Sequence, residues 1–243
     1  MRLQDRTILI TGGTSGIGLE QVRQLIVSNT IIVVSRSSAG LDRLAKEFPS
    51  IAAYQCCLTD GMKVKQTISD VIRDFPRVSV VINNAGIQKT PSFLDESFCY
   101  DEIEDEVKVN LVAPIKICAL MLRHFLALNE TSAFVNISSG LALFPKKTSA
   151  VYCATKAAIH NFSRSFRYQL EETDIRVHEA ILPLVDTPMT EGRHGGKISA
   201  PKAASEIISG IEKARDEIYI GRSRLIPTLA RLSPSLMAKI MKS

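Results

Sequence analysis

Short, almost continuously apolar runs alternate along this chain with longer segments in which apolar residues recur every three or four positions. Runs such as Ile31–Val34 are typical of strands that are buried on both faces of a parallel sheet. The first pattern predicts strands at Thr7–Thr11, Thr30–Ser35, Ala52–Cys57, Ser79–Asn83, Ala133–Ser138, Arg176–Leu182 and Glu217–Gly221. The second predicts helices at Gly16–Val27, Gly40–Phe48, Gly61–Phe75, Tyr100–Leu128, Val151–Glu172 and Pro201–Ala214. Strands that alternate with helices indicate an α/β fold, a doubly wound parallel sheet with helices on both faces.

Length and composition are those of a soluble globular protein. The 243 residues are 45% hydrophobic and 23% charged, which favours one α/β domain over two small ones. No charge-free apolar run reaches ~18 residues, so we expect no membrane-spanning helix. The N-terminal residues lead directly into the first predicted strand without an apolar signal core, so we expect a cytoplasmic protein.

Cysteine, histidine and charge patterns argue against several kinds of site. The five cysteines lack Cys-x-x-Cys spacing, which favours reduced thiols in the core, and the four histidines lack metal-like spacing, so we expect no metal. The net charge of +5 comes from residues 222–243, which hold five basic residues and no acidic one. The remaining chain has 25 basic and 25 acidic residues, so we expect no nucleic-acid-binding surface.

A glycine-rich run follows the first predicted strand and opens the first predicted helix. Glycines allow a tight turn that brings backbone N–H groups to a phosphate at the helix N-terminus. The alternative is a tight turn without a ligand. The run predicts a phosphate-binding turn at Gly12, Thr14, Ser15, Gly16, Ile17 and Gly18.

The second predicted strand ends in Ser35 and Arg36, where a site that prefers NAD usually carries an Asp or Glu for the ribose 2′-hydroxyl. The guanidinium of Arg36 is suited to a 2′-phosphate, and the missing carboxylate removes a repulsion. Arg36 could also be a solvated surface charge. We infer NADP(H) in preference to NAD(H).

Tyr152 and Lys156 are four residues apart, so one helical turn places the phenol and the ammonium on the same face. A neighbouring ammonium favours the phenolate, so we expect Lys156 to lower the pKa of Tyr152 from ~10 towards neutrality. Tyr152 is thus a candidate general acid and base.

Taken together, these residues resemble the classical short-chain dehydrogenase/reductase family over residues 5–221. The resemblance rests on the glycine-rich run, Asn83-Asn84-Ala85-Gly86, Asn110, Ser139 and Tyr152-x-x-x-Lys156, in the family's order. It implies a single-domain Rossmann-type fold and a homodimer or homotetramer. It also implies hydride transfer between NAD(P)(H) and a small-molecule carbonyl or alcohol.

The resemblance implies a catalytic set of four residues. Ser139 would bind the substrate oxygen, and Tyr152 would exchange a proton with it. Lys156 would tune Tyr152 and bind the nicotinamide ribose, and Asn110 would hold a water that links Lys156 to solvent. Asn110 could instead be a structural amide, and Ser139 could merely close a strand. The family pattern adds cofactor contacts at Leu58, Asn84, Ala85, Gly86, Val185 and Thr187.

The chain departs from the family pattern at two places. Cys57 stands where the family commonly has an Asp near the adenine, and the later acid Asp60 could only cap a helix, so adenine recognition would use the Leu58 backbone. Pro183 replaces a flexible Gly and stiffens the wall beside the nicotinamide.

The substrate pocket is expected near Tyr152 and residues 183–200. Residues 187–200 are the best candidate for a mobile loop, in which His194 could touch substrate. Phe144, Leu184 and Met189 suggest an apolar wall. The acidic run Glu102, Glu104, Asp105 and Glu106 is expected to form a solvated helix face.

Residues 222–243 form a basic amphipathic extension of the 1–221 catalytic domain, with helical apolar spacing interrupted at Pro227 and Pro234. We favour packing on its own domain or on a sister subunit over peripheral contact with an anionic membrane. The tail and the run from Pro183 to Met189 resemble the DltE-like oxidoreductase branch, which is associated with bacterial D-alanyl lipoteichoic acid operons.

The leading hypothesis is therefore an NADP(H)-dependent oxidoreductase that acts on a carbonyl or secondary alcohol. The alternative is a cofactor-binding regulator, or an accessory to cell-envelope assembly, with little turnover.

Overall fold

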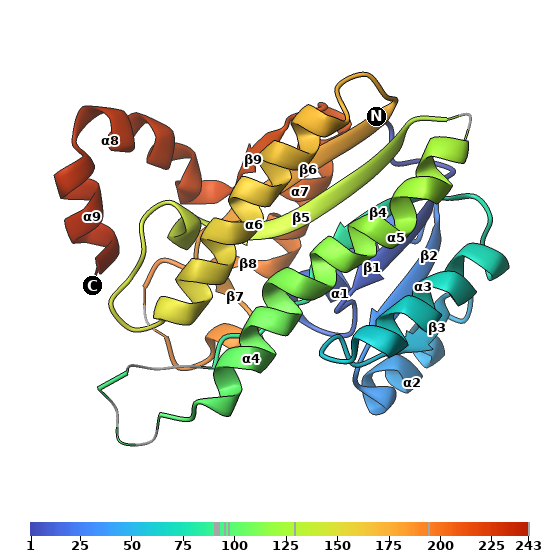
Figure 1. The fold of residues 1–243 in the computed structure, drawn as a ribbon, viewed down its shortest axis with the longest axis horizontal. Coiled ribbons are helices and arrows are strands. Elements are labelled where there is room, and N and C mark those ends of the chain that lie inside the picture. The colour runs from blue at the N-terminus through green and yellow to red at the C-terminus, as the bar shows by residue number, and fades with distance from the viewer. Residues whose placement is uncertain (90–92, 95, 97, 129, 194, 243) are drawn as a thin grey trace.

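The computed structural model describes residues 1–89, 93–94, 96, 98–128, 130–193 and 195–242. Parallel strands form one sheet in the order β3-β2-β1-β4-β5-β6-β9, with helices on both faces (Figure 1). The strands are β1 (Thr7–Thr11), β2 (Thr30–Ser35), β3 (Ala52–Gln55), β4 (Val78–Asn83), β5 (Ser132–Ser139), β6 (Ile175–Leu182) and β9 (Glu217–Tyr219). The predicted fold class and all seven predicted strands are confirmed.

Two layers of helices enclose this sheet. One layer packs on the first hydrophobic cluster and consists of α1 (Gly16–Leu25), α2 (Ser38–Glu47) and α7 (Ala200–Glu212). The other packs on the second cluster and consists of α3 (Gly61–Asp74), α5 (Ala113–Ala127) and α6 (Ala150–Gln169). Both faces of the strands are therefore buried, which explains why their sequences are continuously apolar.

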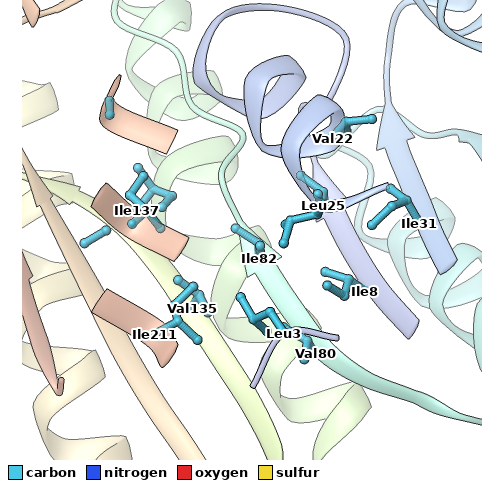
Figure 2. Packing of buried hydrophobic residues seen from close by; sticks show 14 of the residues in the cluster. Leu3, Ile8, Val22, Leu25, Ile31, Val80, Ile82, Val135, Ile137 and Ile211 are labelled. Carbon is cyan, nitrogen blue, oxygen red and sulfur yellow. The ribbon is translucent and has the colours of Figure 1, made fainter. Parts of the chain in front are cut away.

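Side chains of each central strand alternate between the two clusters. Ile8 of β1 and Ile82 of β4 lie in the first cluster beside Val22 and Leu25 of α1, whereas Leu9 lies in the second (Figure 2). Ile8 and Leu9 are fully buried. Each such side chain contributes about 1.5–3 kcal/mol relative to an exposed position, which holds the central strands in register.

The long helix predicted at Tyr100–Leu128 contains a change of geometry. It consists of α4 (Asp101–Val107), a π-helical turn (Lys108–Val112) and α5. The predicted solvated face is wrong at Glu106, which is fully buried and shares the inner face with Val109 and Asn110. Residues 101–127 are long and apolar enough to cross a membrane by length and composition alone, but α5 contributes its inner face to the second cluster, as the core helix of a globular domain does.

A buried polar network joins the elements beneath the carboxyl ends of the strands. Asn83 Nδ2 donates to Asn136 Oδ1 across β4 and β5 at 2.9 Å, and Asn136 Nδ2 donates to Ser163 Oγ on α6 at 2.9 Å. Asn83 thus fastens β4 to β5, and α6 is fixed relative to the two strands that precede the site.

The segment after β6 contains short regular elements that the sequence pattern did not indicate. Strands β7 (Val185–Asp186) and β8 (Ile198–Ser199) form a separate parallel pair, and a 3₁₀ turn covers Pro188–Thr190. Thr190 is buried, and its hydroxyl donates to the Val185 carbonyl at 2.6 Å. The proposed substrate contact His194 lies outside the described residues.

The C-terminal tail folds back on its own chain at one end of the domain (Figure 1). It contains α8 (Ile226–Leu232) and α9 (Pro234–Lys242), so the chain breaks at Pro234 as predicted. Ile226 and Met237 are buried, and the Lys147 N–H donates to the Lys242 carbonyl at 3.2 Å. Packing on its own domain, the interpretation favoured from the sequence, therefore holds for these contacts.

One buried ion pair connects α6 with β6. His160 Nδ1 donates to Glu179 Oε2 at 2.8 Å, and Glu217 of β9 completes a cluster whose potential ligand atoms lie within 4.8 Å of one another. Tyr219 donates to Glu217 at 2.9 Å, and Arg164 lies 4.0 Å from it. These contacts join α6, β6 and β9.

The hydrogen bond from Glu179 raises the pKa of His160 above its ordinary 6.5. The pair therefore contributes stability that is fully present below the unfolded pKa and is lost as pH rises through the folded one. We predict that the wild-type free energy of unfolding falls more between pH ~5.5 and ~9 than that of Glu179→Gln. Urea unfolding across this range measures it, with the exposed Glu172→Gln as the control, and parallel pH profiles of wild type and Glu179→Gln would contradict the prediction.

Candidate active site

A cavity of ≈ 440 Å³ lies at the carboxyl ends of the central strands. It spans the point between β1 and β4 where the strand order reverses, which is where open α/β sheets bind their ligands. The predicted site residues that line it are Gly12, Thr14, Ser15, Gly16, Ile17, Ser35, Arg36, Leu58, Asn84, Ala85, Gly86, Tyr152, Lys156 and Thr187. Segments distant in the sequence thus meet in one groove.

The glycine-rich turn is held open by hydrogen bonds from the β4 end. Thr11 Oγ1 accepts from the N–H groups of Asn84 and Ala85 at 3.1 and 3.0 Å. Asn84 Nδ2 donates to the carbonyls of Thr11 and Gly12 at 3.0 and 3.2 Å. Asn84 therefore shapes the turn in addition to lining the cavity.

Two glycines of this turn have different physical roles. Gly16 has φ +54°, a left-handed conformation, and faces Thr187. Gly18 is buried and does not line the cavity, although the sequence placed it among the cofactor contacts. A Cβ at Gly18 would clash with the Gly12 carbonyl and the Asn84 amide, so Gly18 allows α1 to pack closely on the turn.

The N-terminus of α1 meets the requirements of a phosphate site. Ser15 is the N-cap residue, yet its side chain makes no capping hydrogen bond, and the first turn carries no acidic residue. The helix N-terminus has a partial positive charge, and its uncapped N–H groups suit a diphosphate. The groove therefore fits a dinucleotide.

The end of the groove next to β2 is basic. Arg36 and Arg43 both line it and are exposed, and neither forms an ion pair with any residue that the structure describes. Arg43 was missed from the sequence because it lies a helical turn and more beyond the strand end. Ser35 Oγ lies 3.1 Å from Thr14 Oγ1, which links this end to the glycine-rich turn.

The segment after β3 confirms the predicted helix cap at Asp60, but it shows that the predicted burial of the cysteines is wrong in part. Asp60 caps α3 by accepting from the N–H groups of Met62 and Lys63 at 3.0 Å each, and Leu58 lines the groove. The predicted core position of the cysteines is wrong for Cys57 and Cys99, which are exposed, because Cys57 follows the end of β3 and faces the groove. All five thiols are free.

Ser139 ends β5 and meets Tyr152 from the first turn of α6. The Ser139 hydroxyl slightly opposes the raised pKa of the Tyr152 phenol, and it accepts from the Leu141 N–H at 3.2 Å. Ser138 is buried, and its hydroxyl has no hydrogen-bond partner among the described residues. Ser138 lines the groove and Ser139 does not, so the role of Ser139 in binding the substrate oxygen stays a prediction.

Burial controls the ionisation of Tyr152 and Lys156. Lys156 Nζ donates to the Ile137 carbonyl at 2.8 Å and lies 5.5 Å from the centroid of the Tyr152 ring. Burial lowers the pKa of Lys156 to about 8, although Glu179 and Glu106 act in the opposite direction. Glu106 is a second residue that the sequence pattern missed.

The predicted direction of the Tyr152 shift is wrong for the protein without a cofactor. Burial raises the pKa of the phenol to about 12, and the largest opposing effect comes from the charge of Arg193 rather than from Lys156. The desolvation of the phenolate therefore outweighs the neighbouring ammonium. Without a cofactor, Tyr152 is a proton donor at neutral pH.

Asn110 occupies the π-helical turn between α4 and α5, a geometry frequent at functional sites. Its amide is fully buried: Oδ1 accepts from the Ile87 N–H and Nδ2 donates to the Ile87 carbonyl, both at 2.8 Å. Asn110 thus fixes the segment after Gly86. This is the structural alternative left open in the sequence, and the water link to Lys156 stays a prediction.

Of the two cofactor contacts predicted after β6, Val185 and Thr187, one lines the groove. Thr187 lines the groove and faces Gly16, whereas Val185 is buried in the first cluster and does not line it. Pro188 and Met189 line the groove as well.

Comparisons with known proteins agree with this geometry. The family model for short chain dehydrogenases matches residues 6–196. The chain is 34% identical over 225 residues to the uncharacterized oxidoreductase DltE of Bacillus subtilis, covering 90% of this chain and 89% of that one. A short chain dehydrogenase from Burkholderia cenocepacia in complex with NADP has TM-score 0.88 at 20% identity over 100% of both chains.

A second solved structure carries the other cofactor. The short chain dehydrogenase/reductase from Burkholderia phymatum in complex with NAD has TM-score 0.86 at 17% identity, over 100% of this chain and 97% of that one. The matched family residues include the glycine-rich turn, Ser139, Tyr152 and Lys156. The chain therefore belongs to the short-chain dehydrogenase family of nicotinamide-dependent oxidoreductases.

Proposed function

We propose that this protein transfers hydride between NADP(H) and a carbonyl or secondary alcohol, with Tyr152 as the general acid and base. The observation that carries the proposal is the Tyr152–Lys156 pair at the wall of a groove suited to a dinucleotide, with Lys156 Nζ 5.5 Å from the centroid of the Tyr152 ring. A protein that only binds its cofactor would have no need for this pair at the groove wall.

The chain's own residues supply binding, orientation and the proton. The cofactor, when bound, donates hydride to the carbonyl carbon or accepts it from the alcohol carbon. Ser139 and Tyr152 bind the substrate oxygen, and the Tyr152 hydroxyl gives that oxygen a proton in reduction and takes one back in oxidation. Lys156 is held by the Ile137 carbonyl next to the phenol, where its charge would stabilise the tyrosinate left by proton transfer.

The preference for NADP(H) rests on Arg36 and Arg43. Both guanidinium groups line the groove at the β2 end, without an acidic partner among the described residues. A 2′-phosphate would bring two negative charges to these donors, whereas the 2′-hydroxyl of NAD(H) would leave them unpaired.

Assembly and location follow the same proposal. We expect a homodimer or homotetramer, as the family generally forms oligomers. A cytoplasmic location fits a chain whose five cysteines are all free thiols. Light scattering after size exclusion measures the mass of the particle, and a monomer at micromolar concentration would contradict the assembly.

Tyr152→Phe removes the proton donor while keeping the ring. We predict that kcat for carbonyl reduction falls by roughly 10²–10⁴-fold, while the Kd for NADPH changes little. Absorbance of NADPH measures turnover, and quenching of its fluorescence measures binding. Undiminished turnover would remove Tyr152 from the mechanism. The absence of turnover in the wild-type protein on a broad carbonyl panel, with intact NADPH binding, would favour the regulatory alternative.

The raised pKa of Tyr152 makes a prediction for the protein without cofactor. Because the phenol has a pKa of about 12, it stays protonated at neutral pH, and alcohol oxidation needs a deprotonation that reduction does not. We predict that the tyrosinate absorbance of wild type and Tyr152→Phe stays identical up to pH ~10. An ionisation near neutral pH that is seen in wild type but not in Tyr152→Phe would contradict this prediction. It would mean that the Lys156 ammonium, rather than burial, determines the pKa of Tyr152.

Removal of the two arginines tests the cofactor preference. We predict that Arg36→Ala and Arg43→Ala each raise the Kd for NADPH by about 10-fold or more, because each loses a charge-assisted hydrogen bond, while the Kd for NADH changes by no more than about 3-fold. Lys46→Ala, which removes an exposed charge from α2 away from the groove, is the matched control. Equal weakening of both cofactors would refute the 2′-phosphate assignment.

A further inference from the structure

Two basic side chains, Arg193, whose charge acts on the Tyr152 phenol, and Lys146, whose pKa is lowered by Arg193, do not line the cofactor groove. Lys146 belongs to the segment between Ser139 and α6, and Arg193 to the segment between β7 and β8. The first of these segments leads directly into α6, the helix that carries Tyr152. Neither residue belongs to the motifs on which the family resemblance rests.

The position of Arg193 is set by neutral partners. Its Nη1 donates to Gln88 Oε1 at 2.5 Å, and Gln88 Nε2 donates to Ser149 Oγ at 2.6 Å. Ser149 is the N-cap residue of α6, one turn before Tyr152. The chain of contacts therefore anchors the guanidinium to the element that carries the phenol.

Arg193 has binding capacity to spare. A guanidinium has five N–H donors, and the contact with Gln88 uses one of them. No carboxylate among the described residues pairs with Arg193 or with Lys146. Other cations of this region do have partners: Lys89 lies 3.5 Å from Glu102, and Lys197 lies 3.2 Å from Asp186.

The two charges act on each other and on the phenol. The positive charge of Arg193 lowers the pKa of Lys146, adding to the effect of burial, and it is also the main charge that opposes the raised pKa of Tyr152. Two like charges at close range repel each other. An anion between them would relieve that repulsion and use the free donors.

The anion is not a phosphate of the cofactor. The dinucleotide phosphates are assigned to the glycine-rich turn and the N-terminus of α1, and the 2′-phosphate to Arg36 and Arg43. Lys146 and Arg193 do not line that groove.

We propose that the substrate carries an oxyanion group, a carboxylate or a phosphate, which Arg193 and Lys146 bind while the carbonyl oxygen faces Tyr152 and Ser139. The planar fork of Arg193 suits a bidentate contact with either group. The anion site stands on the contacts of Arg193, and its role in turnover rests on the proposed hydride transfer.

The test uses the full-length protein with NADPH and two matched substrate pairs. Levulinate is compared with methyl levulinate, and dihydroxyacetone phosphate with dihydroxyacetone. We expect the charged member of at least one pair to have a kcat/KM about 10-fold or more above its neutral partner, consistent with one charged contact worth about 1.4 kcal/mol. The pair that responds tells a carboxylate site from a phosphate site.

Charge removal then assigns the effect to residues. Arg193→Gln should reduce the advantage of the charged member to about 3-fold or less through its KM, and Lys146→Gln should reduce it in part. Arg193→Lys should restore part of the advantage, because it restores the charge without the fork. Lys65→Gln, an exposed charge on α3, should leave the ratio unchanged. Neutral members used as well as charged ones, or equal KM changes for both members in Arg193→Gln, would overturn the proposal.

A binding measurement separates this proposal from the hydride-transfer proposal. Thermal-shift titrations of levulinate and dihydroxyacetone phosphate, with NADPH present, are run on wild type and Arg193→Gln. If no carbonyl is turned over but an anion binds and needs Arg193, the anion site stands and the proposed reaction fails. If neutral carbonyls alone are turned over, the reaction stands and the anion site fails. If neither anion is turned over or binds in a manner that needs Arg193, the anion site is overturned.

Discussion

The structure depends on the hydrogen bonds that join the ends of β1 and β4 where the strand order reverses. Parallel strands on either side of this point lead their loops in opposite directions, which opens a groove. Thr11 and Asn84 bridge it with side-chain-to-backbone hydrogen bonds, so the glycine-rich turn has a fixed shape before any ligand arrives. A preformed turn spares the cofactor the entropy of ordering the backbone that binds it. The turn can do this because Gly18 allows α1 to lie directly against it.

The same rigidity extends to Tyr152 and Lys156. Asn83, Asn136 and Ser163 tie β4 and β5 to α6, and Asn110 fixes the backbone at Ile87. The Lys156 ammonium is buried and the Tyr152 side chain is partly buried at the wall of the groove. Burial then shifts both pKa values toward the neutral species, upward for Tyr152 and downward for Lys156. The position of the pair on one helical face, clear from the sequence, thus does not determine its ionisation.

The sequence predicts a structural feature well when residues close in the chain determine it, and poorly when distant segments do. The strands were predictable because burial on both faces leaves continuous apolar runs such as Ile31–Val34, and the Asp60 cap because capping acts within three residues. Glu106 was assigned to a solvated face because charge alone does not reveal which side of a helix meets the core. Arg43 and Arg193 were missed because their sites are assembled from segments far apart in the chain. The Tyr152 pKa required a depth of burial that no spacing conveys.

Because Arg193 acts on the Tyr152 phenol, an anion bound to Arg193 would change the pKa of that phenol. In the unliganded protein, its charge partly offsets the effect of burial on the Tyr152 phenol. An oxyanion bound to Arg193 would neutralise that charge and add a negative one near the hydroxyl, and both changes disfavour the phenolate. Such a substrate would raise the pKa of Tyr152 further, so the phenol would stay protonated. Hydride transfer would then place negative charge on the carbonyl oxygen. At that moment the oxygen becomes the stronger base, and the proton moves to it. The arrangement would therefore keep Tyr152 in the protonated form that carbonyl reduction needs while such a substrate is bound at neutral pH.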